Sequence, residues 1–339
     1  MRRGTPIGGK STRSAATVLA CCCALALACS QDPELQVHFA QVQFTWRQAA
    51  PCPIARFEAM GAPAGGELVV LGGFVTFNLD VTSSVQVYDP GSDHWRDAPP
   101  LLGAQTHVGV ARSGDDLVLA GGFVGQGVHT TTSQVWLRRT TDGAFLPLPA
   151  LPQPGAAFGL VELSDGLHAV GGLAADGVTD SAEHTVLSGN AWTSRAPLPN
   201  PRNHLGAATL GASLYVVGGR HGWDEASGDQ SSLDEYDSVG DSWLRRAAFP
   251  QPASEIAAST LATSGGRMIV VGGSVAGARP TAVVLLYDPA ADAWTRLPDL
   301  PEPRKGAVAV SIGQEIIVTT GSPTGIDPSA STWRGCCIQ

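Results

Sequence analysis

Charged side chains are scarce in this sequence. Lys, Arg, Asp and Glu make up 15% of its 339 residues, against about a quarter in an average soluble domain. Acidic residues outnumber basic ones and the formal net charge is −9, so the chain lacks the basic excess with which nucleic-acid-binding proteins neutralise phosphates. Hydrophobic residues nevertheless reach 43%, which is enough to bury a sizeable core. The composition therefore excludes a disordered chain and argues against a nucleic-acid-binding protein.

Long apolar runs are also few. The only one, residues 15–28, follows a basic start and is typical of an export signal, because it is shorter than the roughly 20 residues of a membrane span. We predict a signal peptide over 1–28 and a short tether over 29–36. The run ends in Ala26-Leu27-Ala28-Cys29, which resembles the lipobox of bacterial lipoproteins and implies a lipid on Cys29. Ala26-Leu27-Ala28 also fits ordinary secretory cleavage, and both routes predict an exported protein: lipid-anchored on the periplasmic or surface side, or else periplasmic or secreted.

Few cysteines follow the signal: Cys29, Cys52, Cys336 and Cys337. If Cys29 carries a lipid, at most one disulfide remains possible in the oxidising compartment that export implies. A Cys52–Cys336 bridge would join the two ends of the folded region and stabilise it by about 4–5 kcal/mol in the entropic model. The alternative is a free or vicinal Cys336–Cys337 pair in a C-terminal tail over 336–339.

A repeat organises the rest of the chain. Apolar runs end in Gly-Gly at Gly73, Gly122, Gly172, Gly219 and Gly273, and a sixth run ends at Gly321 with only one Gly. Successive copies lie 47 to 54 residues apart, and an aromatic residue follows each of the first five after 20 to 24 residues: Trp95, Phe145, Trp192, Trp243 and Trp294. Short apolar strands separated by turn residues at this period predict four-stranded sheets repeated around an axis.

These Gly-Gly and aromatic spacings resemble the kelch family of β-propellers over Arg56 to Trp333. The resemblance implies an all-β, six-bladed propeller with four-stranded blades over 37–335. The last repeat is short, because only 12 residues separate Gly321 from Trp333. The segment 37–46 alternates like a strand, so we predict that it joins the last blade and closes the ring. A degenerate seventh blade is the alternative.

In kelch propellers the first strand of each blade starts at the mouth of the central channel. Counting back 17 residues from the second Gly places three arginines there, Arg56, Arg202 and Arg304, with Glu58, His107, His204, Glu255 and Lys305 around them. Three guanidinium groups facing one opening would favour an anionic ligand such as a sugar carboxylate or a phosphate. The alternative is that each Arg pairs with a carboxylate or carbonyl of its own blade.

Trp223 falls outside the repeat pattern, in a long loop after Gly218-Gly219. Such an aromatic could stack on a sugar ring or on a partner's side chain. It could equally fold back onto its own blade. The sequence leaves both readings open.

Familiar catalytic and metal-binding patterns do not occur in the sequence: there is no H-E-x-x-H, zinc-type C-x-x-C pair, G-x-S-x-G or phosphate loop. We therefore expect no cofactor and no metal, and a non-catalytic module at the bacterial cell envelope that binds a protein or a glycan. The four tyrosines all belong to the repeat or a core strand, which disfavours copper chemistry like that of galactose oxidase. The enzyme alternative is a sugar mutarotase similar to the kelch N-acetylneuraminate epimerases, with Glu58 and Glu255 as acid and base.

Overall fold

A computed structural model describes residues 43–128, 130–223, 228–256, 261–264 and 266–338. The predicted signal peptide, the tether and Cys29 lie outside these residues. The described residues contain strands and turns but no helix, so none of their segments is a helix that could cross a membrane.

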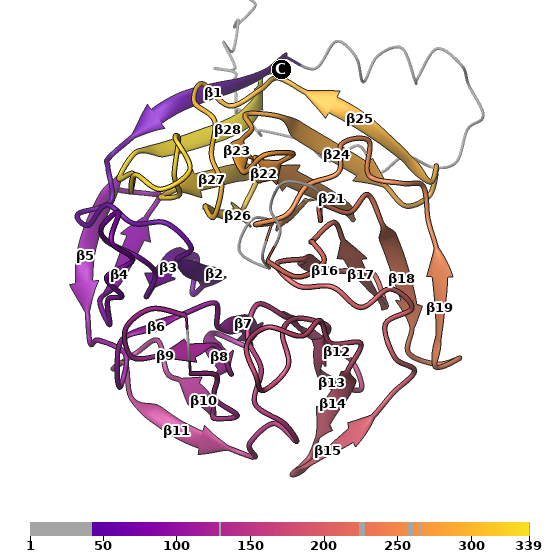
Figure 1. Cartoon of the computed structure of the whole chain (residues 1–339). Coiled ribbons are helices and arrows are strands. Elements are labelled where there is room, and N and C mark those ends of the chain that lie inside the picture. Colours follow the sequence, from indigo (N-terminus) through magenta and orange to yellow (C-terminus); the bar gives the residue numbers. More distant parts are fainter. Residues whose placement is uncertain (1–42, 129, 224–227, 257–260, 265, 339) are drawn as a thin grey trace, which may run out of the picture. The chain divides into compact units, whose positions relative to one another are not determined.

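Six four-stranded antiparallel sheets form the blades of a β-propeller (Figure 1). The innermost strands are β2 (Met60–Ala64), β7 (Gly109–Ser113), β12 (Gly159–Leu163), β16 (Gly206–Leu210), β20 (Leu261–Ser264) and β26 (Val308–Ile312). Each of these strands contacts the innermost strand of the next blade, and β26 contacts β2, so the ring is closed. The second strands are β3 (Glu67–Leu71), β8 (Asp116–Ala120), β13 (Gly166–Val170), β17 (Ser213–Val217), β21 (Arg267–Val271) and β27 (Glu315–Thr319).

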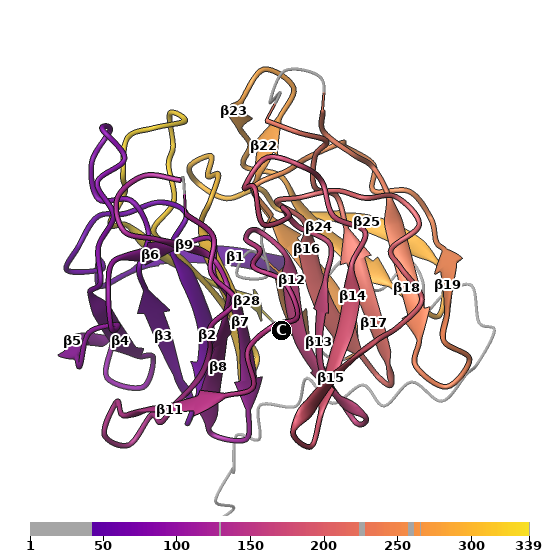
Figure 2. The same ribbon diagram turned by 60° about the horizontal axis from the view of Figure 1, so that its bottom comes forward.

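The third strands are β4 (Val85–Asp89), β10 (Val135–Arg138), β14 (His184–Ser188), β18 (Leu233–Asp237), β24 (Val284–Asp288) and β28 (Thr332–Ile338). The outermost strands are β5 (His94–Ala98), β11 (Phe145–Leu148), β15 (Ala191–Ser194), β19 (Ser242–Arg245), β25 (Ala293–Leu297) and β1 (Gln43–Ala49). Two small ladders pair loop segments: β6 (Gln105–Thr106) with β9 (Phe123–Val124), and β22 (Ser274–Val275) with β23 (Arg279–Pro280). All long loops between second and third strands lie on one side of the ring, as Figure 2 shows.

The ring closes in the way the sequence predicts, because β1 is the outermost strand of the sixth blade and pairs with β28. The bounds differ from those expected. Strand β1 runs to Ala49 instead of ending at 46, and residues 37–42 of the predicted strand lie outside the described residues. The expected tail is also wrong in its start, because β28 continues through Ile338.

The predicted Cys52–Cys336 disulfide is wrong, because both cysteines are free thiols in the structure. The strand register explains why. Cys52 lies beyond Ala49, the last residue of β1, which pairs with Thr332. Cys336 is four residues further along β28, about 13 Å at the usual rise of a strand, whereas a disulfide needs Cα atoms within about 7 Å.

Among the described residues the six largest hydrophobic clusters each combine side chains from two neighbouring blades, and two smaller clusters lie around Phe123 and Phe74. The repeated aromatic residues hold these contacts. In blade 4 the Trp243 indole donates a hydrogen bond to Ala196 O of the preceding link at 2.8 Å. The Tyr236 hydroxyl donates to Asp241 Oδ1 at 2.7 Å, and the same oxygen accepts from Ala196 N. Blades 1 and 5 repeat this Tyr–Asp–Trp latch.

Candidate functional site

The three predicted arginines do not line the channel. Arg56, Arg202 and Arg304 are fully buried, and each donates to the main-chain carbonyl 16 residues further on, at Gly72, Gly218 and Thr320. The guanidinium groups therefore fasten the first strand of a blade to the end of the second strand, and they converge on no common ligand.

Side-chain partners within the same blade complete this role. Arg202 forms a buried ion pair with Asp234 at 3.0 Å, Arg56 contacts Gln86, and Arg304 pairs with Glu302. The expectation of an anion site built from these three arginines is wrong, and the alternative of pairing within each blade is confirmed.

A collar surrounds the channel axis two residues after the arginine position. It consists of one residue from each blade with a positive φ of 47° to 57°: Glu58, His107, Ala157, His204, Glu255 and Gly306. Main-chain hydrogen bonds join neighbouring blades within it, from Ala157 N to His107 O at 3.0 Å and from His204 N to Ala157 O at 3.1 Å. Because non-glycine residues adopt this backbone conformation only where the surroundings enforce it, the collar fixes the direction of its side chains.

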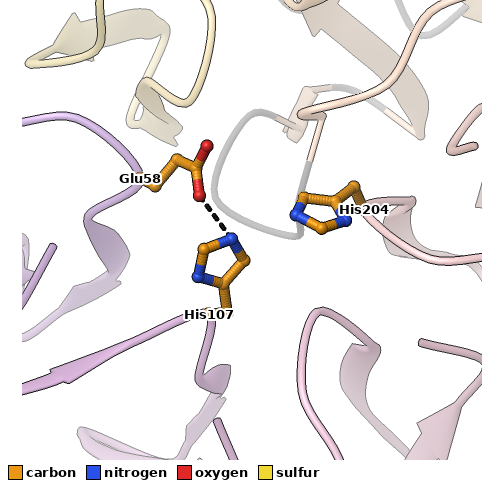
Figure 3. Close-up of side chains that lie close together, drawn as sticks. All are labelled: Glu58, His107 and His204. Carbon is orange, nitrogen blue, oxygen red and sulfur yellow. Dashed lines mark ion pairs between the residues drawn. The ribbon is translucent and has the colours of Figure 1, made fainter. Parts of the chain in front are cut away.

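Four of the predicted site residues meet at this collar. Glu58, His107 and His204 point toward one another across the axis (Figure 3), and Glu255 contacts the same group through a side-chain hydrogen bond with Glu58. Glu58 forms an ion pair with His107, and the rings of His107 and His204 pack edge to face at 4.9 Å. We call these residues, together with Arg220 and Lys305, the axial cluster.

Arg220 is the member that sequence reasoning missed. It follows Gly218-Gly219 directly, and the corresponding positions of the other blades hold Phe74, Phe123, Leu173, Ser274 and Ser322. The sequence therefore did contain a signal for Arg220: it is a charged residue at a position where the other blades have an apolar or small one. Its guanidinium lies 2.6 Å from Glu255 Oε1 and donates to His204 Nε2 at 3.2 Å.

Burial and charge control protonation in the axial cluster. Burial, and then the neighbouring Glu255, raise the pKa of Glu58 to about 7. Burial alone would raise the pKa of Glu255 as well, but Arg220, a hydrogen bond from Glu58 and Lys305 hold it well below its usual range. Burial and Arg220 lower the pKa of His204, so this ring is neutral at physiological pH.

Trp223 contacts its own blade and a neighbouring one. Its indole donates to Gly177 O of blade 3 at 3.1 Å, and its ring packs against His204 at 5.5 Å. The Arg220 guanidinium lies 5.4 Å from the same ring. With 37% of its surface exposed, Trp223 partly covers the axial cluster from the loop side.

Two cavities lie along the axis. One of about 30 Å³ borders Glu58, His107, His204 and Glu255; it holds no more than a few water molecules and is far too small for a sugar. The other, of about 580 Å³, lies at the opposite end of the innermost strands, where small and apolar residues such as Gly61, Ala111 and Ala208 line it. None of the predicted site residues faces this wider cavity.

Comparisons with known proteins agree with this architecture. Residues 62–102 and 257–301 match the model of the kelch motif. The chain is 28% identical over 293 residues to Kelch-like protein terF of Aspergillus terreus, which covers 82% of this chain and 52% of that protein. It is 38% identical over 120 residues to Kelch repeat and BTB domain-containing protein 13 of Homo sapiens, covering 34% of this chain and 25% of that protein. It is 34% identical over 167 residues to Kelch-like protein 34 of Homo sapiens, covering 48% and 24%.

The chain thus spans about half the length of the first of these relatives and about a quarter of the other two. The motif matches and the relatives support the kelch-repeat family, and the fold is the six-bladed propeller with four-stranded blades that this repeat forms.

Proposed function

We propose that this chain is a non-catalytic module that binds a protein partner through its loop face. The loop face consists of the described parts of the connections 72–84, 121–134, 171–183, 218–232, 272–283 and 320–331, together with the link 99–104. Large apolar side chains are exposed on it in different blades: Phe77 is 64% exposed, Val178 58% and Ile326 54%.

The single observation that carries this proposal is the gathering of such side chains on one face. Among the described residues, nine large hydrophobic side chains are exposed, and six of them lie on the loop face: Phe77, Leu79, Leu102, Val178, Trp223 and Ile326. Exposed apolar surface of this kind is typical of protein interaction sites, where buried aromatic and aliphatic side chains provide much of the affinity.

A small-molecule reaction has less support. The arginines that would bind an acidic sugar are held inside their blades, and the cavity beside Glu58 and Glu255 is too small for a sugar. We therefore do not extend the proposal to a mutarotase.

The test compares a loop-face variant with a matched control. The variant Phe77→Ser/Val178→Ser/Ile326→Ser removes exposed apolar area from three blades, and Val239→Ser/Leu244→Ser removes it from the turn and outermost strand of blade 4. None of these five side chains belongs to a buried hydrophobic cluster, so both variants should melt within a few degrees of the parent chain. We expect the proteins that crosslink to the parent chain in extracts of its source cells to crosslink to the control variant as well, but not to the loop-face variant. Equal crosslinking of all three chains would overturn the proposal.

We also propose that the module is exported and held at a bacterial envelope, where a glycan is the alternative ligand. The basic start and the apolar run ending at Cys29 support this. Mass spectrometry of the mature N-terminus after expression in a bacterium, with Cys29→Ser as the matched variant, distinguishes a lipidated Cys29 from simple cleavage. An intact leader on the recovered protein would contradict export.

A further inference from the structure

The tautomer of His107 is fixed by its neighbour. The Thr106 hydroxyl uses its proton on Glu58 O at 3.0 Å, so its oxygen must accept the hydrogen bond that joins it to His107 Nδ1 at 3.1 Å. His107 Nδ1 therefore carries a proton, and Nε2 points to the axis, where it pairs with Glu58 Oε2. A metal ion at this place would displace the proton that the pair shares.

His204 is held in the same tautomer by an independent set of contacts. The Asn203 amide nitrogen donates to Asp180 and to Gly222 O, which leaves the amide oxygen to accept from His204 Nδ1. The lone pair of His204 Nε2 therefore also faces the axis. Hydrogen bonds of this kind to the remote ring nitrogen are what orient histidines that bind metals.

Three electron-pair donors thus face one point of the propeller axis: two imidazole nitrogens and the carboxylate of Glu58. Their ligand atoms all lie within 4.8 Å of one another (Figure 3). They come from blades 1, 2 and 4, and the collar conformation sets the direction of each. Lone pairs brought together in a buried place repel one another unless a proton or a cation lies between them.

We propose that Glu58, His107 and His204 form a binding site for a divalent transition metal ion of the Zn²⁺ type. Two neutral imidazoles and one carboxylate are a ligand set that suits Zn²⁺, and three protein ligands leave one coordination position for water or a ligand. The collar prevents the three side chains from moving apart.

The remaining charges of the axial cluster set the strength of the site. Arg220 Nη2 donates to His204 Nε2 in the arrangement that the structure shows, so a metal ion replaces this bond while Arg220 keeps its ion pair with Glu255. Arg220 and Lys305 together outweigh Glu255 by one positive charge, which opposes a cation. We therefore expect weaker binding than at a closed four-ligand structural site, and tighter binding in Arg220→Gln.

The experiment measures metal binding by the whole chain after treatment with a chelator. Dialysis against Zn²⁺ followed by elemental analysis should give one ion per chain, and Co²⁺ should give the intense visible bands of low coordination number. His107→Gln and Glu58→Gln keep the side-chain volumes and should lose the bands, whereas His94→Ala, at an exposed histidine of β5, should keep them.

If a variant fails to fold, Zn²⁺ binding by the parent chain alone still tests the proposal. Zn²⁺ that binds only the folded state raises the melting temperature with concentration. A parent chain that binds no stoichiometric Zn²⁺ overturns the proposal. So do folded His107→Gln and Glu58→Gln variants that retain the Co²⁺ bands of the parent.

Discussion

Arg202 and His204 are two residues apart, yet they belong to two regions that use polar side chains differently. Arg202 lies inside a blade, where its hydrogen bonds go to the main chain and to Asp234. His204 lies at the axis, where its side chain contacts Arg220 of its own blade and His107 of blade 2. Inside the blades the same arginine recurs in three repeats, whereas the six collar positions carry Glu, His, Ala, His, Glu and Gly. The repeated polar residues hold the fold, and the residues that depart from the repeat form the candidate site.

The largest effect should come from breaking the blade interior. Arg202→Ala leaves the buried Asp234 without its internal partner and removes the hydrogen bonds of the guanidinium to the carbonyls of Asn200, Val216 and Gly218. We expect the free energy of unfolding to fall by about 3–5 kcal/mol, the usual result of removing one partner of a buried ion pair. Urea unfolding of the purified chain measures it.

Arg245→Ala is the control, because Arg245 pairs with the same Asp234 from a half-exposed position. Its loss should reduce the unfolding free energy by about 1 kcal/mol or less. If the two variants lose the same unfolding free energy, the polar contacts inside the blade and those at its surface stabilise the fold equally, and the contrast drawn above is wrong.

A smaller effect should follow from weakening a latch between blades. Tyr236→Phe removes the hydroxyl that donates to Asp241 Oδ1 while keeping the ring that packs against Trp243. We expect a loss of about 1–2 kcal/mol in unfolding free energy. Tyr287→Phe removes the corresponding bond to Asp292 in blade 5 and should cost a similar amount. If either replacement leaves the urea midpoint unchanged, the latch contributes nothing measurable.

A further effect appears only when the pH is lowered and concerns the interior of blade 3. Burial lowers the pKa of His184 to about 4, so the unfolded chain, with a pKa near 6.5, binds the proton more tightly. Stability from this group is complete above pH 6.5 and is lost as the pH falls toward 4. Between these values the unfolding free energy of the parent chain should fall by up to about 1.4 kcal/mol per pH unit more than that of His184→Gln.

The control for this prediction is His94→Gln at the surface, which should keep the pH slope of the parent chain. A slope that is the same in His184→Gln and the parent chain would mean that this histidine is not neutral in the fold.

The fold could be predicted because the repeat encodes it. Gly72-Gly73 illustrates why: Gly73 has a φ of 91°, and an added Cβ there would lie 2.8 Å from the backbone of Ala59. Only glycine fits at this position, so the Gly-Gly motif marks the end of the second strand in a blade. The closure by β1 was predictable for a similar reason, because the last repeat lacks a fourth strand.

The candidate site was predictable only in part. Counting from Gly-Gly located Glu58, His107 and His204 near the axis, but it could not show which way a side chain points. The positive φ of the collar turns these residues to the axis, while the arginine two positions earlier turns into the blade. The small cavity beside Glu58 and the tautomers of the histidines depend on contacts between blades, which no single repeat contains.

The pairing of β1 with β28 also determines on which side of the ring the first and last described residues lie. Gln43 and Ile338 are register partners, and because strands alternate in direction across the sixth blade, both residues lie on the side of the ring away from the loop face. A group joined directly before Gln43 or directly after Ile338 therefore starts on the side of the ring away from the loop face. Attachment at either of these strand ends is thus compatible with access to that face.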